Sequence, residues 1–318
     1  MSIIKQHITN KSLKRKNVQD KIAKNVFFGG TILSATFIVL IIIFTFIKGV
    51  APFISNKYES NVNLYTFITG MKWLDGPTGI SVDYSIGFAI VNTLIVVIIS
   101  LLIAVPISVL TGLFIAKIAP NRVAEFFRMI VELLASIPSI IFGVFGIGVI
   151  APLIMELGNT LGVQTAGGIS VITTAIVLAM MIIPTITVMA ENSIRSVDKT
   201  LEQGSLALGA TPTQTHLKVL VPAAKSGIFA GVILGVGRAL GEATAVSMVS
   251  GNRFSGIVLN PFDTTSTLTS RMLLGIKETT GMDYDIRFSV GLVLMVVILL
   301  TNVILKAIMK KVGNLDDN

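Results

Sequence analysis

Long stretches of the sequence contain no charged side chain at all. A charged group at the centre of a bilayer costs roughly 2.5 to 3.5 kcal/mol, and a helix needs about 20 apolar residues to cross. The stretches long enough to cross are Asn25–Ile47, Tyr84–Ala116, Leu133–Met155, Gly168–Ala190 and Phe288–Leu305. A further apolar stretch, Ser226–Gly251, is interrupted only by Arg238 and Glu242. We therefore expect six transmembrane helices.

The composition excludes several other classes of protein. Charged residues make up 13% of the 318 residues, whereas about 25% is typical of soluble domains. The hydrophobic fraction of 53% excludes disorder, a collagen-like chain and a nucleic-acid-binding protein. No cysteine is present, and the two histidines, His7 and His216, lie outside the expected spans. We therefore expect neither a disulfide nor a metal site.

The distribution of basic residues predicts the orientation. With the N-terminus inside, 17 of the 25 basic residues fall on the cytoplasmic side and 6 on the other. Basic residues gather on the cytoplasmic side of membrane proteins, so both termini are expected there. The net charge of +8 then reflects topology and attraction to membrane lipids.

These observations divide the chain into segments. We expect a core of five transmembrane helices at 84–308, which contains a cytoplasmic loop at 195–225. The other expected segments are a basic cytoplasmic tail at 1–25, a first transmembrane helix at 26–50, an extracytoplasmic loop at 51–83 and a cytoplasmic tail at 309–318.

The cytoplasmic loop is too long for a simple connector. A short helix is predicted at Val197–Leu208, ending at Gly209, a residue suited to a left-handed C-cap. A second helix is predicted to begin at Thr211, with Gln214 completing a capping box. Two short helices at a fixed angle form a docking element, although these signals also fit a membrane-surface hairpin without a partner.

Arg238 and Glu242 are the two charges inside an expected span. At a spacing of four residues they would share one face of a helix. They could form a buried ion pair between helices or belong to a substrate pathway, and charged groups within membranes favour the second interpretation. The guanidinium fork suits an oxyanion such as phosphate. The carboxylate could hold the guanidinium in place while no anion is bound. It could also accept a hydrogen bond from the proton of hydrogen phosphate, and fully ionised sulfate carries no such proton.

The loop also resembles a known motif. SLALGAT at 205–211 and VLVPA at 219–223 are similar to the Glu-Ala-Ala loop of ABC importer permeases. In that family the loop inserts a coupling helix into a separate ATPase subunit. The Glu-Ala-Ala positions read Gln203, Gly204 and Ser205 here, with Glu202 one place earlier. The resemblance implies ATPase contacts at Leu201, Glu202, Gln203, Ser205, Ala207, Leu208, Gly209 and Ala210.

Two further segments of the sequence give a more specific resemblance. GVGRALGEATAVSMVSGN at 235–252 and ELLASIPSIIFG at 132–143 resemble the PstC-type subunit of the phosphate importers. This resemblance implies an all-α, MetI-like type I permease in the cytoplasmic membrane, with Arg238, Glu242 and Thr244 along the substrate pathway. It further implies a PstA-type permease, a PstB-type ATPase dimer and a PstS-type phosphate-binding protein as partners.

The sequence has no phosphate-binding loop of the form G-x-x-x-x-G-K-[ST], and no catalytic motif of a membrane enzyme. We therefore expect no enzyme active site and no cofactor in this chain, with ATP and Mg²⁺ bound by the partner ATPase. The alternatives are a permease for another oxyanion, such as molybdate or sulfate, and a stand-alone secondary phosphate carrier.

Overall fold

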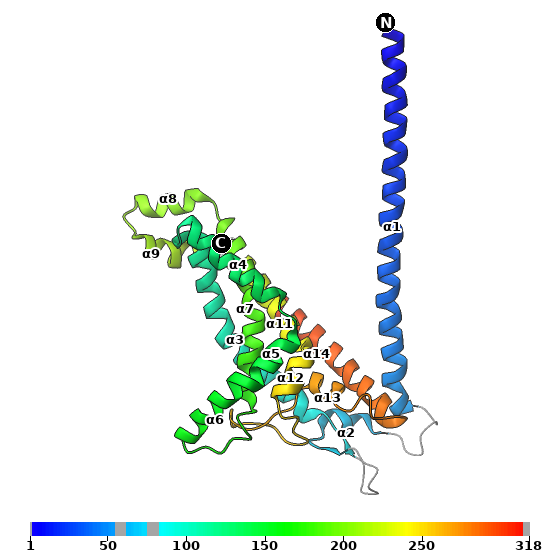
Figure 1. Cartoon of the computed structure of the whole chain (residues 1–318), viewed down its shortest axis with the longest axis vertical. Helices are drawn as coiled ribbons and strands as arrows, with labels where there is room; N and C mark the ends of the chain where they lie inside the picture. The colour runs from blue at the N-terminus through cyan, green and yellow to red at the C-terminus, as the bar shows by residue number, and fades with distance from the viewer. Residues whose placement is uncertain (1, 55–61, 75–82, 314–318) are drawn as a thin grey trace.

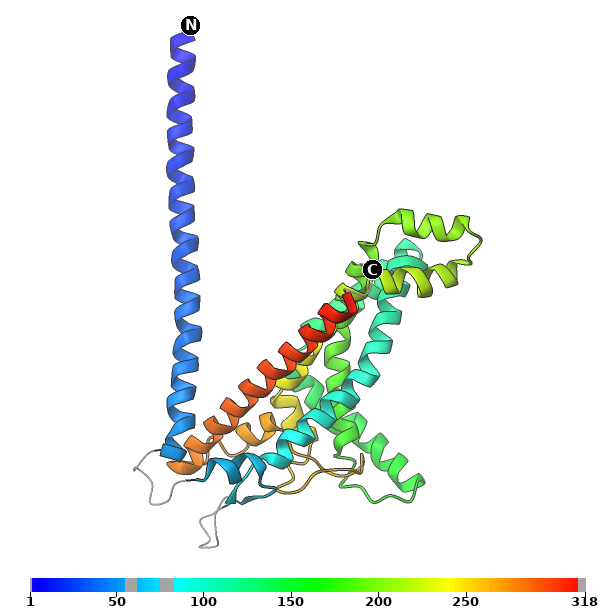
Figure 2. The same cartoon turned by 180° about the vertical axis from the view of Figure 1, so that it is seen from behind.

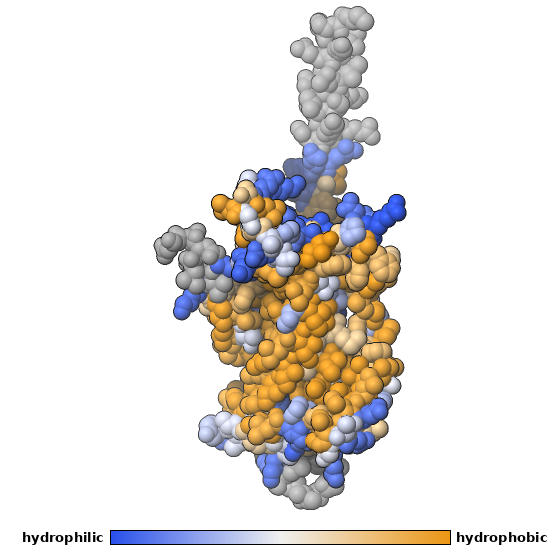
Figure 3. Space-filling view, turned by 90° about the vertical axis from the view of Figure 1, so that its left-hand side faces the viewer, coloured by the Kyte–Doolittle hydropathy of each residue, from blue (hydrophilic) through white to orange (hydrophobic). Residues whose placement is uncertain are grey.

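The computed structural model describes residues 2–54, 62–74 and 83–313. Among these residues, five helices are long and apolar enough to cross a membrane, and a bent pair of helices makes a sixth if it forms one span. This confirms the expected all-α architecture with several spans. Figure 3 shows the resulting surface, a broad hydrophobic band between hydrophilic residues at the two ends of the bundle.

The first helix, α1 (Ser2–Ile54), is attached to the bundle through its C-terminal end. There it contacts α14 (Met282–Gly313), where Gly49 allows such a close approach that a Cβ would lie 2.9 Å from the Phe288 carbonyl oxygen. The Ser289 hydroxyl donates to the Gly49 carbonyl at 2.6 Å. The remainder of α1 diverges from the bundle, and its membrane-length apolar part is exposed (Figures 1 and 2).

The centre of the bundle is formed by α3 (Gly87–Leu113), α7 (Val171–Arg195) and α11 (Lys225–Gly241). Small residues let these helices approach closely, as is common between membrane helices. A Cβ on Gly112 of α3 would lie 2.9 Å from the backbone nitrogen of Glu191 on α7. Contact between two backbones leaves no room for a side chain at this position.

We expect Gly112→Leu to destabilise the bundle, because α3 and α7 would have to separate. Overpacking of this kind costs about 1 to 3 kcal/mol in other proteins. The midpoint of thermal unfolding in detergent should fall measurably. Gly148→Leu is the matched control, since a Cβ at Gly148 meets nothing within 4 Å. Equal midpoints for the two variants would contradict the close α3–α7 contact.

The third expected span is displaced along the chain. Its expected range, Leu133–Met155, crosses a break at Pro138, and the membrane-length helix is Ser139–Thr160 instead. Proline disfavours helical backbone in the residue before it, and Ile137 is accordingly extended, with ψ 127°. The elements on either side of the break are α4 (Asn121–Ser136), α5 (Ser139–Phe145), the π-helical turn η2 (Gly146–Ile150) and α6 (Ala151–Thr160).

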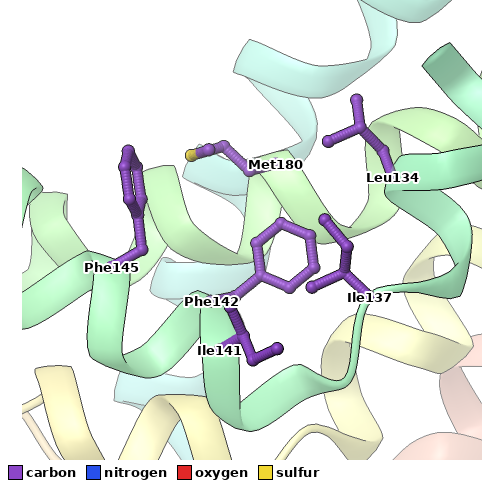
Figure 4. A pocket seen from close by; sticks show the side chains of 6 residues that line it. All are labelled: Leu134, Ile137, Ile141, Phe142, Phe145 and Met180. Atoms are coloured by element: carbon purple, nitrogen blue, oxygen red, sulfur yellow. The ribbon is translucent and has the colours of Figure 1, made fainter.

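An apolar cavity of about 220 Å³ lies beside this break. Figure 4 shows the side chains that line it, which come from α4, α5 and α7 and from the residue that precedes Pro138. They are Leu134, Ile137, Ile141, Phe142, Phe145 and Met180. An anion site needs charged or hydrogen-bonding donors, so we place the candidate site elsewhere.

Two groups of short elements lie at opposite ends of the bundle (Figure 1). At one end are α2 (Leu64–Thr69), α13 (Leu268–Leu273) and an antiparallel pair of strands, β1 (Trp73–Leu74) and β2 (Asp83–Tyr84). The other end carries α8 (Lys199–Ala207), α9 (Pro212–Thr215), and the ends of both α1 and α14 that are nearest the termini.

Candidate functional site

The fifth expected span is broken where its charged residues lie. Helix α11 ends at Gly241, Glu242 has extended backbone (φ −74°, ψ 119°), and α12 (Thr244–Val249) begins two residues later. Arg238 is therefore helical and Glu242 is not. The expected pairing of these residues on one helical face is wrong, and no ion pair joins the two side chains, both of which the structure describes.

Glu242 instead stabilises the break. Its carboxylate accepts a hydrogen bond from the backbone N–H of Ala245 at 3.0 Å, within the first turn of α12. A side-chain acceptor there satisfies one of the N–H groups that a helix leaves free at its start. The Glu242 carbonyl accepts from the hydroxyl of Thr269 on α13 at 2.7 Å. These bonds fix the direction in which α12 leaves the break.

Arg238 extends toward α7. Its Nη1 atom donates to the Thr185 hydroxyl at 3.3 Å, and Thr185 follows the helix-interior Pro184. The guanidinium is partly buried and makes no ion pair within the described part of the chain. Arginine carries five N–H donors, so this single bond leaves donors for an anion.

Thr244, the third residue expected along the pathway, is the first residue of α12. Its carbonyl accepts from the Ser247 hydroxyl at 2.9 Å. Arg238, Glu242 and Thr244 thus lie within seven positions that span the break, and the fold adds Thr185 beside Arg238 and Thr269 beside Glu242, which the sequence reasoning missed. A hydroxyl directly after a proline in an apolar helix could have pointed to Thr185. Nothing local in the sequence points to Thr269, since it reaches the break from α13, which lies more than 20 positions further along the chain.

The helix-turn-helix loop has the expected local structure. Helix α8 starts after Asp198, whose carboxylate accepts the N–H of Thr200 at 2.9 Å, and this bond lowers the pKa of Asp198. At its other end Gly209 has φ +86°, as a left-handed C-cap requires. The predicted capping box of Thr211 and Gln214 is confirmed, with bonds of 3.0 and 3.3 Å. The second helix then continues through the π-helical turn η3 (His216–Leu220) and α10 (Val221–Ala223), with a bend of 66° before α11.

The residues expected to contact an ATPase fall into two groups. Leu208 is 91% exposed, and Leu201, Gln203, Ala207 and Gly209 are also exposed. An exposed leucine beside a tight turn provides an apolar surface for a partner.

The remaining expected contacts are partly buried. Glu202 forms an ion pair within the chain with Lys117 at 2.5 Å, and its other carboxylate oxygen lies 3.7 Å from Nε2 of His216. The Ser205 hydroxyl lies 2.9 Å from that of Thr215, and Ala210 lies at the turn. Direct contact of Glu202 and Ser205 with an ATPase stays a prediction.

A second ionic cluster lies near the same end of the bundle. The Glu191 carboxylate, on a side chain that is 5% exposed, accepts from Arg128 of α4 at 2.5 Å and from Arg195 at 2.9 Å. The bond to Glu191 raises the pKa of Arg128. Arg195 also donates to the Ile115 carbonyl at 3.0 Å, in the π-helical turn η1 (Phe114–Ile118) that continues α3. In the described part of the chain, no cluster of potential metal ligands is present.

Several known permeases have sequences similar to this chain. The probable ABC transporter permease YqgH of Bacillus subtilis is 36% identical over 260 residues, covering 81% of this chain and 80% of its own. The phosphate transport system permease PstC of Pasteurella multocida is 30% identical over 289 residues, covering 85% and 90%. PstC 1 of Mycobacterium tuberculosis is 32% identical over 224 residues, covering 65% and 66%.

Solved structures share the fold. A bacterial ABC transporter involved in alginate import aligns with a TM-score of 0.61 at 15% identity, over 93% of this chain and 99% of its own. The MetNI methionine ABC transporter, in an inward-facing conformation, aligns with a TM-score of 0.52 at 21% identity, over 70% and 91%. These likenesses confirm the expected MetI-like fold. Residues 108–314 match the family described as binding-protein-dependent transport system inner membrane component, and the chain therefore belongs to this family of ABC permeases.

Proposed function

We propose that this chain is a permease subunit of an ATP-driven importer of inorganic phosphate and forms half of the translocation pathway. The observation that carries the proposal is Arg238, a permanent cation within an apolar membrane segment, which lies one turn before a helix break and donates to the Thr185 hydroxyl. A guanidinium can form two parallel hydrogen bonds to one oxyanion while it remains charged. The names of several relatives, which are phosphate permeases, support phosphate as the anion.

The proposal includes the partners that complete the transporter. A second, PstA-type permease would supply the other half of the pathway, and a PstS-type binding protein would deliver phosphate from outside. A PstB-type ATPase dimer would bind ATP and Mg²⁺ and would dock on α8 and the turn at Leu208 and Gly209. The chain would lie in the cytoplasmic membrane, with both termini and α8 on the cytoplasmic side. The common position of these elements at one end of the bundle supports that orientation (Figure 1).

The test is uptake by the assembled transporter in proteoliposomes. We expect labelled phosphate to accumulate only with ATP and binding protein, and to do so after a protonophore collapses the proton gradient. Excess unlabelled phosphate should compete, whereas sulfate and molybdate should not. Uptake without ATP would instead indicate a secondary carrier, and competition by sulfate or molybdate alone would indicate another oxyanion.

A further inference from the structure

We propose that the ion pair between Lys117 and Glu202 links the coupling helix α8 mechanically to the transmembrane helix α3, with Lys117 as a positioning residue for energy coupling. The inference rests on the proposed function, since it concerns how ATPase movement would reach the membrane. Lys117 lies in η1, which continues α3 directly, and Glu202 lies in α8. The Nζ and Oε2 atoms are 2.5 Å apart.

The contact is better protected than an ordinary surface ion pair. The Lys117 side chain is 15% exposed and that of Glu202 is 23% exposed. Exposed ion pairs contribute little because water and salt screen them, and this screening weakens as the pair is buried. His216 of η3 approaches the other carboxylate oxygen of Glu202 at 3.7 Å. Glu202 is therefore held between two π-helical turns, elements that often occur at functional sites.

Few other contacts hold α8 in place. None of its residues is buried, so apolar packing fixes it weakly. Its chain connections run through the turn after α7 and through Gly209. The hydroxyl bond between Ser205 and Thr215 joins α8 only to the helix that follows it in its own loop. Among the described contacts of α8, the Lys117 pair is the one that reaches α3 and η1.

The other end of this link is firmly anchored. Within η1, Ile115 is buried against Ala124 and Val131 of α4, and its carbonyl accepts from Arg195 of α7. Arg195 and Arg128 both bind the buried Glu191. A displacement of Lys117 would therefore be transmitted to α3, α4 and α7 together, because packed cores and satisfied polar networks move as units.

The test uses the full complex in proteoliposomes and measures phosphate transported per ATP hydrolysed. For Lys117→Met we expect the ATPase to copurify as in the wild type and hydrolysis to continue, while this ratio falls about tenfold, as for loss of one hydrogen bond to a charged group. Glu202→Gln, which changes the other partner of the ion pair, should show the same loss. The charge exchange Lys117→Glu with Glu202→Lys should restore most of the ratio.

Arg122→Met is the matched control, because it removes a positive charge from an exposed position on the same side of the bundle. Its ratio should equal that of the wild type. An unchanged ratio in Lys117→Met or Glu202→Gln would overturn the link, as would a charge exchange that restores nothing. Failure of the wild-type complex to retain an ATPase would overturn the proposed function itself, so the two failures are distinguishable.

Discussion

Replacement of Arg238 by alanine is expected to lower phosphate uptake about 100-fold or more while the complex still assembles. Hydrogen bonds to a charged group contribute roughly 1.5 to 3 kcal/mol each, and each 1.4 kcal/mol corresponds to a tenfold change. A guanidinium that holds an anion through two such bonds in a water-poor pathway would account for this loss. The measurement is the initial rate of labelled phosphate uptake, normalised to the amount of reconstituted complex.

The controls for this prediction separate the charge from its surroundings. Arg122→Ala removes an exposed arginine at the end of the bundle and should leave uptake unchanged. Thr185→Val keeps the Arg238 charge but removes its 3.3 Å hydrogen-bond partner, and a smaller loss, about tenfold or less, is expected from one neutral acceptor. Uptake by Arg238→Ala within about twofold of the wild type, less than a single hydrogen bond contributes, would contradict the pathway role.

Glu242 has a different expected signature. Because its carboxylate caps α12, the loss of this side-chain acceptor should alter the position of α12. Glu242→Gln keeps an acceptor oxygen and should retain more uptake than Glu242→Ala, which removes it. Equal uptake by the two variants would show that the cap does not matter for transport. The comparison requires only uptake rates and the amount of assembled complex.

Local chemistry explains which features could be predicted from the sequence. The α8 turn was predictable because each signal acts on its own neighbours: Gly209 tolerates positive φ, and Thr211 bonds a residue three places ahead. Charge-free stretches predicted the spans because the cost of burying charge does not depend on a partner. The same stretches could not locate the break at Pro138, since proline is also tolerated inside membrane helices and is helix-interior at Pro184 in α7.

Features that depend on distant segments were not predictable. The four-residue spacing of Arg238 and Glu242 indicates a pair only if one helix contains both residues. Helix α11 ends between them. Glu242 instead bonds to the first turn of α12 and to Thr269. The clusters around Glu191 and Glu202 each likewise contain an ion pair between residues more than 60 positions apart. Periodicity describes one helix at a time, so it carries no information on which helices meet.

Gly209→Pro is expected to abolish both ATPase association and uptake while the chain still inserts into the membrane. Gly209 has φ +86°, whereas proline is confined to about −65°, so the turn after α8 cannot keep its direction. Leu208, almost fully exposed beside it, would no longer be presented to the ATPase.

Gly162→Pro is the matched control: Gly162 has φ +70°, follows α6, and has open space around its Cα, but lies away from α8. Copurification of the ATPase should be lost only in the Gly209 variant. If ATPase and uptake both survive in Gly209→Pro, α8 is a surface hairpin and the site of energy coupling lies elsewhere in the chain.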